Sequence, residues 1–455
     1  MTSTIEKLIN ELDSKAILLG DDVSQRPNFS YGQGSCPAKA IVRPANTDEL
    51  SAILRICHQD KQTVVPWGGL TGLVNGISCT SEDIAISSER MSAIEHLDIE
   101  AGVMTVQAGV PLQKAQEFAA KHGWLFALDL GARGTATVGG AIATNAGGNS
   151  VVRYGMMRQQ VLGMEVLLAD GTVVSSMNEM LKNNAAYDIK QLFIGSEGTL
   201  GLISRAVIRL FPLPSAVQTA FVAVDSFSNL TTLLRTLGHK LEGKLSAFEV
   251  MWQSHYQLLV DDLKKHQAFL PTNYPYYVLI ESSGADKQKE EEQFTQVLGE
   301  LMEDDVIADA VLSQSGQQTT LLWEMRDDIE ALVLSLHPPI SFDISLPLRH
   351  MEQYVNQVTA RLTKDFPDLR CVTFGHLGDG NIHFAMGPVH DKRAIEQVVY
   401  EYLAEFGGSI SAEHGIGLDK KAYLQISRSP EEIAVMQTLK TALDPNGILN
   451  PGKVI

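Results

Sequence analysis

The sequence predicts an α+β protein of two or three domains, and three observations support this class. The length of 455 residues corresponds to two or three domains of ordinary size. A hydrophobic content of 44% can fill a core and excludes a disordered polyanion. Glycine-dense patches alternate with strand-like and helix-like segments before Pro-Leu-Pro-Ser at 212–215, and the composition changes after that run.

The composition along the chain divides it into three parts. Residues 1–214 hold the glycine patches and are predicted to form a ligand-binding domain. Residues 215–405 have little clustered glycine and several amphipathic stretches, which predicts a second α+β domain with an antiparallel sheet. Residues 406–455 are predicted to be a C-terminal segment that packs back on the first domain.

Local patterns predict the elements in order along the chain. Hydrophobic period and turn residues identify them. They are a capped helix starting at Ser3 with Glu6, strands at 41–44 and 63–66, a helix through Leu50, Ile53, Leu54 and Cys57, a strand at 104–109, a helix near 112–122, a hairpin at 161–174 turning at Asp170–Gly171, and a solvated helix at 287–303.

The charge and cysteine content exclude several classes of protein. A formal net charge of −18 argues against a nucleic-acid partner, because binding phosphates requires a surface rich in Lys and Arg. No apolar run approaches the roughly 20 residues that cross a bilayer. The four cysteines show no CxxC spacing, and the N-terminus lacks a secretion profile. We therefore expect reduced thiols and a cytoplasmic location, with peripheral contact to a membrane quinone pool left open.

Three glycine patches are candidates for one long cofactor site. The loop 66–72 follows a predicted strand and suits either a tight turn or an anion held by backbone amides. It is neither a Walker A loop nor a GxGxxG fingerprint. A second patch at 129–155 and a third at 195–201 repeat the composition. Three such patches within about 140 residues favour an extended phosphate-and-ring ligand.

The order of these patches resembles the flavin domain of the vanillyl-alcohol oxidase / p-cresol methylhydroxylase (PCMH) superfamily. The matching stretches are PWGGLTG, VGGAIATNAGG, RYG and IGSEGTLGLIS. The resemblance implies a PCMH-type fold, bound FAD and a set of cofactor-binding residues. The set is Pro66, Gly68, Gly69, Leu70, Thr71, Gly72, Gly134, Thr137, Val138, Gly139, Gly140, Thr144, Asn145, Gly147, Gly148, Tyr154, Gly155, Glu197, Gly198, Ile203 and Asn450. Leu70 stands where some members carry the histidine that binds FAD covalently, so we expect non-covalent FAD.

A histidine cluster near the C-terminus indicates a metal. His376 and His383 lie in GHLGDGNIH, and Glu413 and His414 lie in SAEHGIG. Two histidines and a carboxylate can hold a divalent metal with open positions. Adjacent side chains on an extended segment point apart, so Glu413 is assigned to the metal and His414 to general-base catalysis. Zinc suits this set, and manganese and iron are the alternatives.

These two segments resemble the signature of the FAD-linked D-2-hydroxy-acid dehydrogenases, which include D-2-hydroxyglutarate dehydrogenase, D-lactate dehydrogenase and the glycolate oxidase flavin subunit. The resemblance runs from residue 41 to 454. It implies that His376, His383 and Glu413 bind the metal, that His414 is the base, and that Arg326 grips the substrate carboxylate. Trp323 lies on the same predicted helix face as Arg326.

The predicted distal pocket departs from the hydroxyglutarate enzyme. Ser341 replaces a lysine of that relative, Ala385 replaces an asparagine, and Glu330 replaces a small hydroxyl residue. A second substrate carboxylate would therefore gain no basic partner. We expect D-lactate or another monocarboxylic D-2-hydroxy acid, with D-2-hydroxyglutarate or D-malate as the alternative, although the DLGARG wording at 129–134 is closer to the hydroxyglutarate subgroup.

The resulting hypothesis is FAD- and metal-dependent oxidation of a D-2-hydroxy acid to the 2-oxo acid, with a non-NAD electron acceptor. Quinone or an electron-transfer flavoprotein is the expected acceptor, and an oxygen-using oxidase is the alternative. From other classes, a metal-dependent hydrolase or a non-catalytic flavin subunit stays open. A homodimer is the default expectation for a soluble enzyme.

Overall fold

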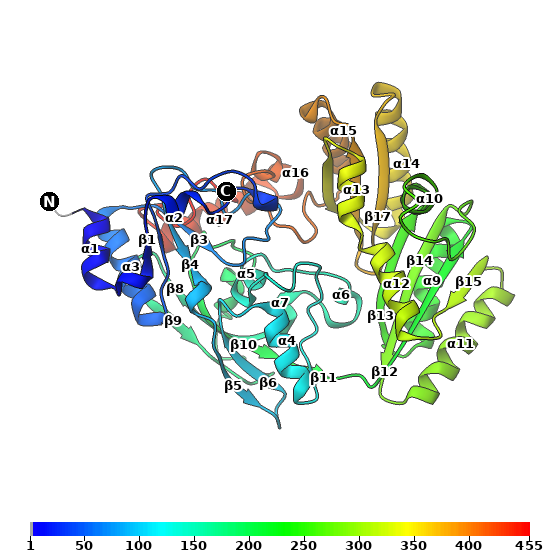
Figure 1. Cartoon of the computed structure of the whole chain (residues 1–455), viewed down its shortest axis with the longest axis horizontal. Coiled ribbons are helices and arrows are strands. Elements are labelled where there is room, and N and C mark those ends of the chain that lie inside the picture. Colours follow the sequence, from blue (N-terminus) through cyan, green and yellow to red (C-terminus); the bar gives the residue numbers. More distant parts are fainter. Residues whose placement is uncertain (1–2) are drawn as a thin grey trace. The chain divides into compact units, whose positions relative to one another are not determined.

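The computed structural model describes residues 3–455 and divides into two compact units (Figure 1). Unit 1 comprises Met1–Gly147, Met156–Leu213 and Glu413–Ile455. Unit 2 comprises Gly148–Gly155 and Pro214–Ala412. The chain therefore passes from unit 1 to unit 2 between Leu213 and Pro214, next to the boundary predicted at 214/215. Unit 2 then continues to Ala412, whereas the second domain was predicted to end at residue 405.

Unit 1 contains two main sheets. The first has the order β1-β2-β4-β3, in which β2, β4 and β3 are parallel and β1 is antiparallel to β2. The second is antiparallel in the order β5-β6-β10-β8-β9, and β7 pairs with β11. Their bounds are β1 (Ile17–Leu18), β2 (Ala40–Val42), β3 (Val64–Trp67), β4 (Ile84–Ser87), β5 (Ile94–Asp98), β6 (Val103–Gln107), β7 (Trp124–Leu125), β8 (Val161–Leu167), β9 (Val173–Ser176), β10 (Leu202–Arg209) and β11 (Phe211–Pro212).

The helices of unit 1 confirm the predictions from local pattern. The N-terminal helix carries both hydrogen bonds of the Ser3–Glu6 capping box, and the hairpin predicted at 161–174 is the β8–β9 pair. The bounds are α1 (Thr4–Glu11), α2 (Asp21–Ser24), α3 (Thr47–Asp60), α4 (Leu112–Lys121), α5 (Val138–Ala143), α7 (Met157–Gln160), α8 (Lys190–Phe193), α16 (Leu424–Ser427) and α17 (Pro430–Leu443), with 3-10 turns η1 (Ser14–Ala16), η2 (Ser30–Gly32), η3 (Ser88–Arg90) and η6 (Lys421–Tyr423).

Helix α3 shows why the periodic pattern forms a helix. Asn46 caps it by accepting a hydrogen bond from the Glu49 amide, and Lys61 ends it in the left-handed region. Leu50, Ile53 and Leu54 are buried in one hydrophobic cluster with strands β2, β3 and β4. Each such side chain contributes about 1.5–3 kcal/mol by leaving water, so this face holds the helix on the parallel sheet that positions the first glycine loop.

Unit 2 is built on one seven-stranded antiparallel sheet in the order β15-β12-β14-β13-β17-β18-β16. All of its strand pairs are antiparallel. The strands are β12 (Ala216–Val224), β13 (Leu245–Trp252), β14 (Tyr276–Gly284), β15 (Asp309–Leu312), β16 (Ile340–Ser345), β17 (Arg370–His376) and β18 (Asn381–Gly387).

Helices cover this sheet, and the predicted solvated helix at 287–303 is present as α11. Its buried residues recur at helical spacing, while its other face is exposed and charged. The helical elements are α6 (Val151–Tyr154), α9 (Phe227–Lys240), α10 (Gln253–Gln257), the π-helical turn η4 (Leu258–Asp262), α11 (Lys287–Glu303), α12 (Gly316–Arg326), α13 (Ile329–Ser335), α14 (Leu348–Asp365), η5 (Leu377–Asp379) and α15 (Lys392–Glu405).

One face of the unit 2 sheet matters for the site. Phe221, Met251 and Leu279 point to this face and form a buried cluster with Leu322 and Met325 of α12. Helix α12 is thus held against the sheet by apolar contacts on the same face that carries Glu249, two residues before Met251.

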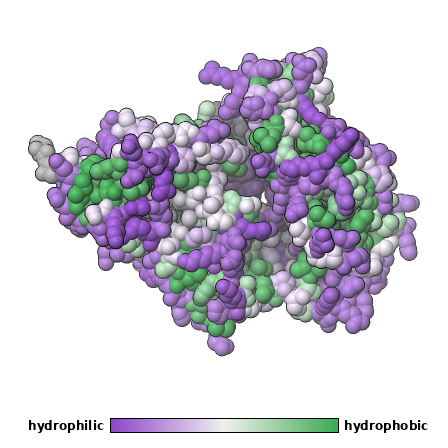
Figure 2. All heavy atoms as spheres, in the orientation of Figure 1, coloured by the Kyte–Doolittle hydropathy of each residue, from purple (hydrophilic) through white to green (hydrophobic). Residues whose placement is uncertain are grey.

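The drawn surface is mostly hydrophilic. On the face drawn in Figure 2, hydrophilic residues predominate and hydrophobic residues form small separate patches. Among residues 3–455, we find no helix with the length and apolar composition needed to span a bilayer.

Candidate functional site

Four polar side chains lie on one face of the unit 2 sheet, on four neighbouring strands. Glu249 of β13 lies directly opposite His376 of β17, and Asp343 of β16 lies directly opposite His383 of β18. Phe374 is opposite His383 and two residues before His376, which puts both pairs on the same face. The register of the sheet, rather than any local motif, therefore assembles this row.

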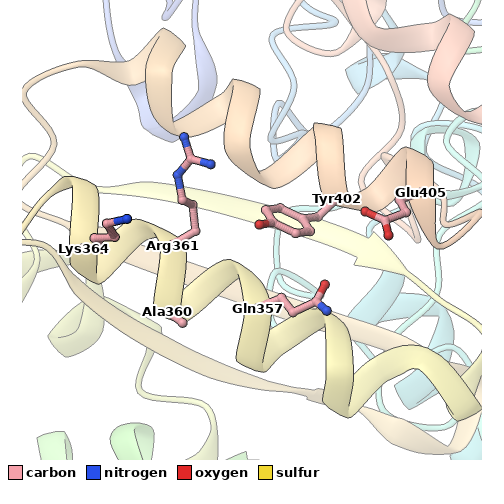
Figure 3. A pocket seen from close by; sticks show the side chains of 6 residues that line it. All are labelled: Gln357, Ala360, Arg361, Lys364, Tyr402 and Glu405. Atoms are coloured by element: carbon pink, nitrogen blue, oxygen red, sulfur yellow. The ribbon is translucent and has the colours of Figure 1, made fainter.

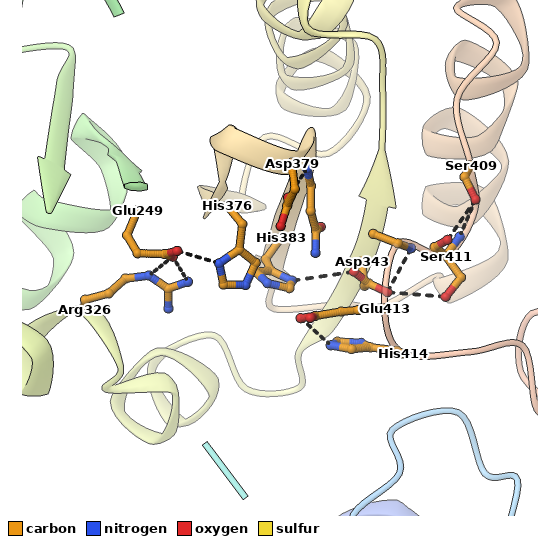
Figure 4. Close-up of polar contacts among 12 residues, drawn as sticks. Glu249, Arg326, Asp343, His376, Asp379, His383, Ser409, Ser411, Glu413 and His414 are labelled. Atoms are coloured by element: carbon orange, nitrogen blue, oxygen red, sulfur yellow. Dashed lines mark hydrogen bonds and ion pairs between the residues drawn. The ribbon is translucent and has the colours of Figure 1, made fainter. Parts of the chain in front are cut away.

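Glu249 connects the predicted metal histidine to the predicted substrate arginine (Figure 4). Its Oε1 lies 2.7 Å from Nδ1 of His376. Its Oε2 accepts hydrogen bonds from Nε and Nη2 of Arg326 at 2.9 and 2.6 Å. Nη1 of Arg326 donates to Asp327 at 3.3 Å, and the guanidinium lies 5.1 Å from the ring centre of Phe374. The guanidinium is therefore fixed along one edge and one face.

The Glu249 group is buried and charged. Glu249 and Arg326 are 1% and 3% exposed. Burial alone would raise the pKa of Glu249, but the neighbouring His376 and Arg326 outweigh burial and hold the pKa below its ordinary value. An ionised carboxylate accepts hydrogen bonds only, so Nδ1 of His376 carries the proton in this contact.

The structure also groups side chains that suit a metal. Asp343, His383, Glu413 and His414 each offer a ligand atom, and these atoms lie within 4.8 Å of one another. Oδ2 of Asp343 accepts hydrogen bonds from the Ser411 hydroxyl at 3.3 Å and the Ala412 amide at 3.2 Å, which orders the chain just before Glu413 (Figure 4). Two imidazoles and two carboxylates are a donor set that fits zinc, manganese or iron.

The predicted metal ligands are only partly gathered in this group. His383 and Glu413 belong to it, and so does the predicted base His414, whose Nε2 lies 3.8 Å from Oε1 of Glu413. His376 is outside it, although its ring centre is 5.3 Å from that of His383 and the two rings are nearly perpendicular. The assignment of ligand and base among these residues stays a prediction.

Sequence reasoning missed Glu249 and Asp343. Both interrupt apolar strands, in AFEVMW and ISFDIS, where a charged residue faces a steep burial cost. That pattern alone could have marked them as candidates, since such charges are kept only with partners or a metal. Their partners could not be found, because they lie far away in the sequence and meet only through strand register.

The predicted substrate residues differ in position and in solvent exposure. Trp323 and Arg326 share a face of α12 as predicted, and the indole Nε1 donates to Oε2 of Glu281 on β14 at 3.3 Å. Ser341 and Glu330 are exposed. Ser341 pairs with Ala385 one step further along the strands that carry Asp343 and His383. Ser341 and Ala385 therefore lie on the same sheet face as Asp343 and His383.

In unit 1 the first two glycine patches pack directly against each other. A Cβ on Gly69 would overlap the carbonyl oxygen of Thr135, and one on Gly68 would lie 2.7 Å from Oγ1 of Thr137. Thr137 in turn caps α5 by accepting a hydrogen bond from the Gly140 amide. These glycines are therefore required for contact between the two loops, whatever ligand they hold.

The first loop presents backbone donors. Within the described chain, the amides of residues 69–73 donate to no protein acceptor, although the loop is half-buried. A Cβ on Gly72 would meet no atom within 4 Å. Unpaired amides beside open space are what a phosphate group needs, so this loop fits the pyrophosphate of FAD.

Asn450 joins the first and third patches. Its Nδ2 donates to the carbonyl oxygens of Glu197 at 2.7 Å and Gly76 at 3.3 Å. Its Oδ1 is buried and has no partner in the part of the chain that the structure describes. A buried carbonyl oxygen without a donor fits a ligand N–H such as those of a flavin ring.

The carboxylate of Glu197 is engaged elsewhere. It accepts hydrogen bonds from the amides of Ile416 at 2.6 Å and Gly417 at 3.0 Å, and so ties the third patch to the C-terminal segment of unit 1. Burial raises the pKa of Glu197, although these two amide hydrogen bonds oppose the shift.

Strained backbone marks the same loops. Leu70, Asn145, Glu197 and Asn450 have φ between 42° and 58°, which non-glycine residues rarely adopt. Gly198 also has positive φ, and a Cβ there would collide with Pro66. Of the remaining predicted cofactor residues, Gly148, Tyr154 and Gly155 belong to unit 2, and Leu70, Thr71, Gly134, Val138, Gly139, Thr144, Gly147 and Ile203 to unit 1.

A shallow groove elsewhere in unit 2 contains none of the predicted residues. It has a volume of about 460 Å³ and is lined by Gln357, Ala360, Arg361 and Lys364 of α14 and by Tyr402 and Glu405 of α15 (Figure 3). It is an open furrow between two helices.

Comparison with protein families assigns both parts of the chain. Residues 38–176 match an FAD-binding domain, and residues 213–454 match the C-terminal domain of FAD-linked oxidases. The chain therefore belongs to the FAD-linked oxidase family. Within it, the chain groups with FAD-dependent D-2-hydroxy-acid dehydrogenases, as three relatives show.

The relatives are similar over most of their length. A protein of Schizosaccharomyces pombe named as a putative mitochondrial D-lactate dehydrogenase is 40% identical, over 91% of this chain and 81% of its own. The mitochondrial D-2-hydroxyglutarate dehydrogenase of Bos taurus is 38% identical, over 92% and 77%. A D-2-hydroxyglutarate–pyruvate transhydrogenase of Saccharomyces cerevisiae is 35% identical, over 91% and 86%.

Solved structures confirm the PCMH-type fold. Substrate-bound p-cresol methylhydroxylase superposes with a TM-score of 0.80 at 13% identity, covering 99% of this chain and 96% of its own. An alkyldihydroxyacetonephosphate synthase superposes with a TM-score of 0.77 at 17% identity, covering 98% and 84%.

These comparisons correct two predictions. The cytoplasmic location is wrong, because relatives of Schizosaccharomyces pombe, Bos taurus and Danio rerio are mitochondrial by name. Unpaired cysteines indicate a reducing environment and do not single out the cytosol. The preference for a monocarboxylic substrate is also less well supported than its alternative, because several of the relatives are named for D-2-hydroxyglutarate.

Proposed function

We propose that this protein oxidises a D-2-hydroxy acid to the 2-oxo acid with FAD and a divalent metal, and that D-2-hydroxyglutarate is the substrate to test first. One observation carries the proposal. The chain is 38% identical to a D-2-hydroxyglutarate dehydrogenase over 92% of its length. The metal-type donor group and the buried Arg326 support the same reaction.

Each residue has a separate task in the proposed reaction. Arg326 binds the substrate C1 carboxylate through the N–H groups that Glu249 leaves available. His383 and Glu413, with His376 as the third predicted ligand, hold the metal. His414 accepts the proton of the 2-hydroxyl group at a ring nitrogen. Unit 1 binds FAD through the 69–73 amides and Asn450.

The two cofactors supply the remaining chemistry. Bound zinc would lower the pKa of the substrate hydroxyl by its positive charge. FAD would accept the hydride from C2, which carries both electrons of the oxidation, as flavins do in dehydrogenases. We propose zinc over manganese or iron because imidazole and carboxylate ligands suit it.

The residues of the predicted distal pocket do not favour a substrate with a second carboxylate. Ser341 and Ala385 offer no positive charge to a second carboxylate, and Glu330 would repel one. D-2-hydroxyglutarate, D-malate and D-lactate should therefore all be tested as substrates. D-2-hydroxyglutarate comes first because relatives are named for it.

The experiment is an anaerobic titration of the FAD- and zinc-loaded protein, following the flavin absorption band. Bleaching by D-2-hydroxyglutarate at lower concentration than by D-lactate, and none by the L-enantiomers, is the expected result. A reversed order would restore the monocarboxylic substrate. No bleaching by any D-acid would refute the reaction class.

The electron acceptor needs its own test. One relative is named as a transhydrogenase that uses pyruvate, so pyruvate joins quinone analogues and an electron-transfer flavoprotein as acceptors to compare. Reoxidation of the reduced flavin would be timed with each acceptor and with oxygen. Rapid reoxidation by oxygen alone, with peroxide formed, would identify an oxidase instead.

A further inference from the structure

We infer that Glu249 is a positioning residue that sets two groups at once: the tautomer of His376 and the open edge of Arg326. This inference rests on the proposed function, because it takes His376 as a metal ligand and Arg326 as the substrate-carboxylate binder. It concerns a residue that no sequence motif marked and that the structure alone places in contact with both.

The histidine half of the inference follows from hydrogen-bond chemistry. Oε1 of Glu249 lies 2.7 Å from Nδ1 of His376, and an ionised carboxylate can only accept. The proton is thereby held on Nδ1, which leaves the Nε2 lone pair for a metal. Carboxylates that bind metal-ligating histidines in this way typically change metal affinity by about 10-fold to 100-fold when replaced.

The arginine half follows from counting donors. A guanidinium has five N–H groups. Glu249 takes those of Nε and Nη2, and Asp327 takes one of Nη1. One N–H on each terminal nitrogen has no partner in the described chain, and these two can bind a carboxylate bidentately. Phe374 covers one face of the group, so the open edge has a fixed direction.

The position of Glu249 makes it hard to replace. It lies on a central strand, is 1% exposed, and meets His376 through cross-strand register. Its two oxygens serve different partners, so neither can be spared. A glutamine offers one accepting oxygen and one donating amide, and one partner must then face a donor. Facing His376, that donor would move the proton to Nε2 and block the metal.

The test compares Glu249→Gln with Glu290→Gln in the FAD-loaded protein. Glu290 is a matched control: it is a buried carboxylate of the same unit, paired with Lys244 at 2.9 Å, and touches no residue of the site. Zinc affinity is measured by competition with a chromophoric chelator, which requires no turnover. We expect Glu249→Gln to weaken zinc binding at least about 10-fold and Glu290→Gln to leave it within twofold.

A double-variant cycle separates positioning from a general structural effect. If Glu249 acts on zinc through His376, then Glu249→Gln should cause no further loss in a His376→Ala background. An equal loss in both backgrounds would overturn the inference, as would an unchanged zinc affinity in Glu249→Gln. These readouts decide the point even if no D-2-hydroxy acid reduces the flavin and the proposed function fails.

Glu249→Asp covers the case in which the glutamine variant does not fold. It keeps the buried charge but shortens the side chain by one methylene, so it cannot reach both partners. We expect Glu249→Asp to weaken the binding of zinc or of the D-acid at least about fivefold, the latter measured from the flavin spectrum. Because the charge is kept, such a loss would report on positioning. Wild-type values for both would show that Glu249 acts as a counter-charge only.

Discussion

Buried carboxylates with more than one donor recur in both units. Glu249 faces an imidazole and a guanidinium, Glu197 faces two backbone amides, and Asp343 faces a hydroxyl and an amide. Removing one donor from such a group costs more than the hydrogen bond is worth, because the charge stays buried. Each of these residues should therefore be sensitive to isosteric replacement.

The stability contributed by Glu197 should depend on pH. Burial raises its pKa above the ordinary value of 4.5, so over the interval between the two values the folded chain holds a proton that the unfolded chain has lost. Its contribution is full below about pH 4.5 and is lost as the pH rises through the folded pKa. We expect the Tm difference, wild type minus Glu197→Gln, to decrease from pH 4 to pH 7.

Thermal unfolding of both proteins with saturating FAD, at half-unit pH steps, measures this difference. The pH dependence of Tm that comes from all other titratable groups is the same in both proteins, so it cancels when the two Tm values are subtracted. A difference that stayed level or grew with pH would contradict a raised pKa at Glu197.

Substitutions at two glycines of the first loop should distinguish an effect on stability from an effect on FAD binding. Gly69→Ala must push against the Thr135 carbonyl, and we expect it to destabilise unit 1 by about 1–3 kcal/mol. Gly72→Ala meets open space, so the free energy of unfolding without FAD should change by less than about 0.5 kcal/mol. If phosphate lies over Gly72, that variant should still lose FAD affinity.

Denaturant unfolding of the apoproteins and fluorescence titration with FAD provide the two readouts. Normal FAD affinity in Gly72→Ala would show that the cofactor does not approach this glycine. Normal stability of Gly69→Ala would contradict the packing of the two loops.

At the level of elements, periodic patterns were enough for α3, α11 and the β8–β9 hairpin. Each is defined by neighbours within about fifteen residues, through caps, apolar spacing or a turn. Local patterns could identify only part of the row on the unit 2 sheet, which consists of Glu249, His376, His383 and Asp343. The two histidines share a motif, but the two acids reach them only through the pairing of β13 with β17 and β16 with β18.

Helix α12 offers a test at this scale, because it carries both Trp323 and Arg326. Its cap is Ser315, which accepts a hydrogen bond from the Gln318 amide at 3.3 Å. Ser315→Ala should cost about 1 kcal/mol and loosen the helix start. We expect a higher KM for the D-acid with little change in kcat, since substrate positioning is affected more than the proton and hydride steps.

Ser226→Ala is the matched control. Ser226 caps α9 in the same way, through the Asn229 amide at 3.1 Å, and α9 carries no predicted site residue. Equal loss of stability in both variants, with KM raised only by Ser315→Ala, is the expected result. A KM raised equally by both would show that the effect comes from stability alone.

At the scale of the whole molecule, the residues predicted for FAD belong mostly to unit 1, and those predicted for the metal come from both units. The loop amides, Asn450, Glu413 and His414 belong to unit 1, whereas Glu249, His376 and His383 belong to unit 2. The units have separate hydrophobic clusters. Ligand binding stabilises the folded form to which it binds, and large chains often unfold domain by domain.

We therefore expect calorimetry of the protein without FAD and zinc to show two unfolding transitions, which FAD and zinc raise by different amounts. FAD at about a thousand times its Kd should add roughly 4 kcal/mol and raise one transition by about 10 °C. Zinc should raise mainly the transition of unit 2, which holds His376 and His383. The Glu249→Gln variant should lose the zinc shift and keep the FAD shift, because the Glu249 carboxylate hydrogen-bonds with His376 and Arg326 and, in the described chain, with none of the glycine loops. A single transition, or equal shifts of both transitions by either ligand alone, would mean that each cofactor stabilises the chain as one cooperative body.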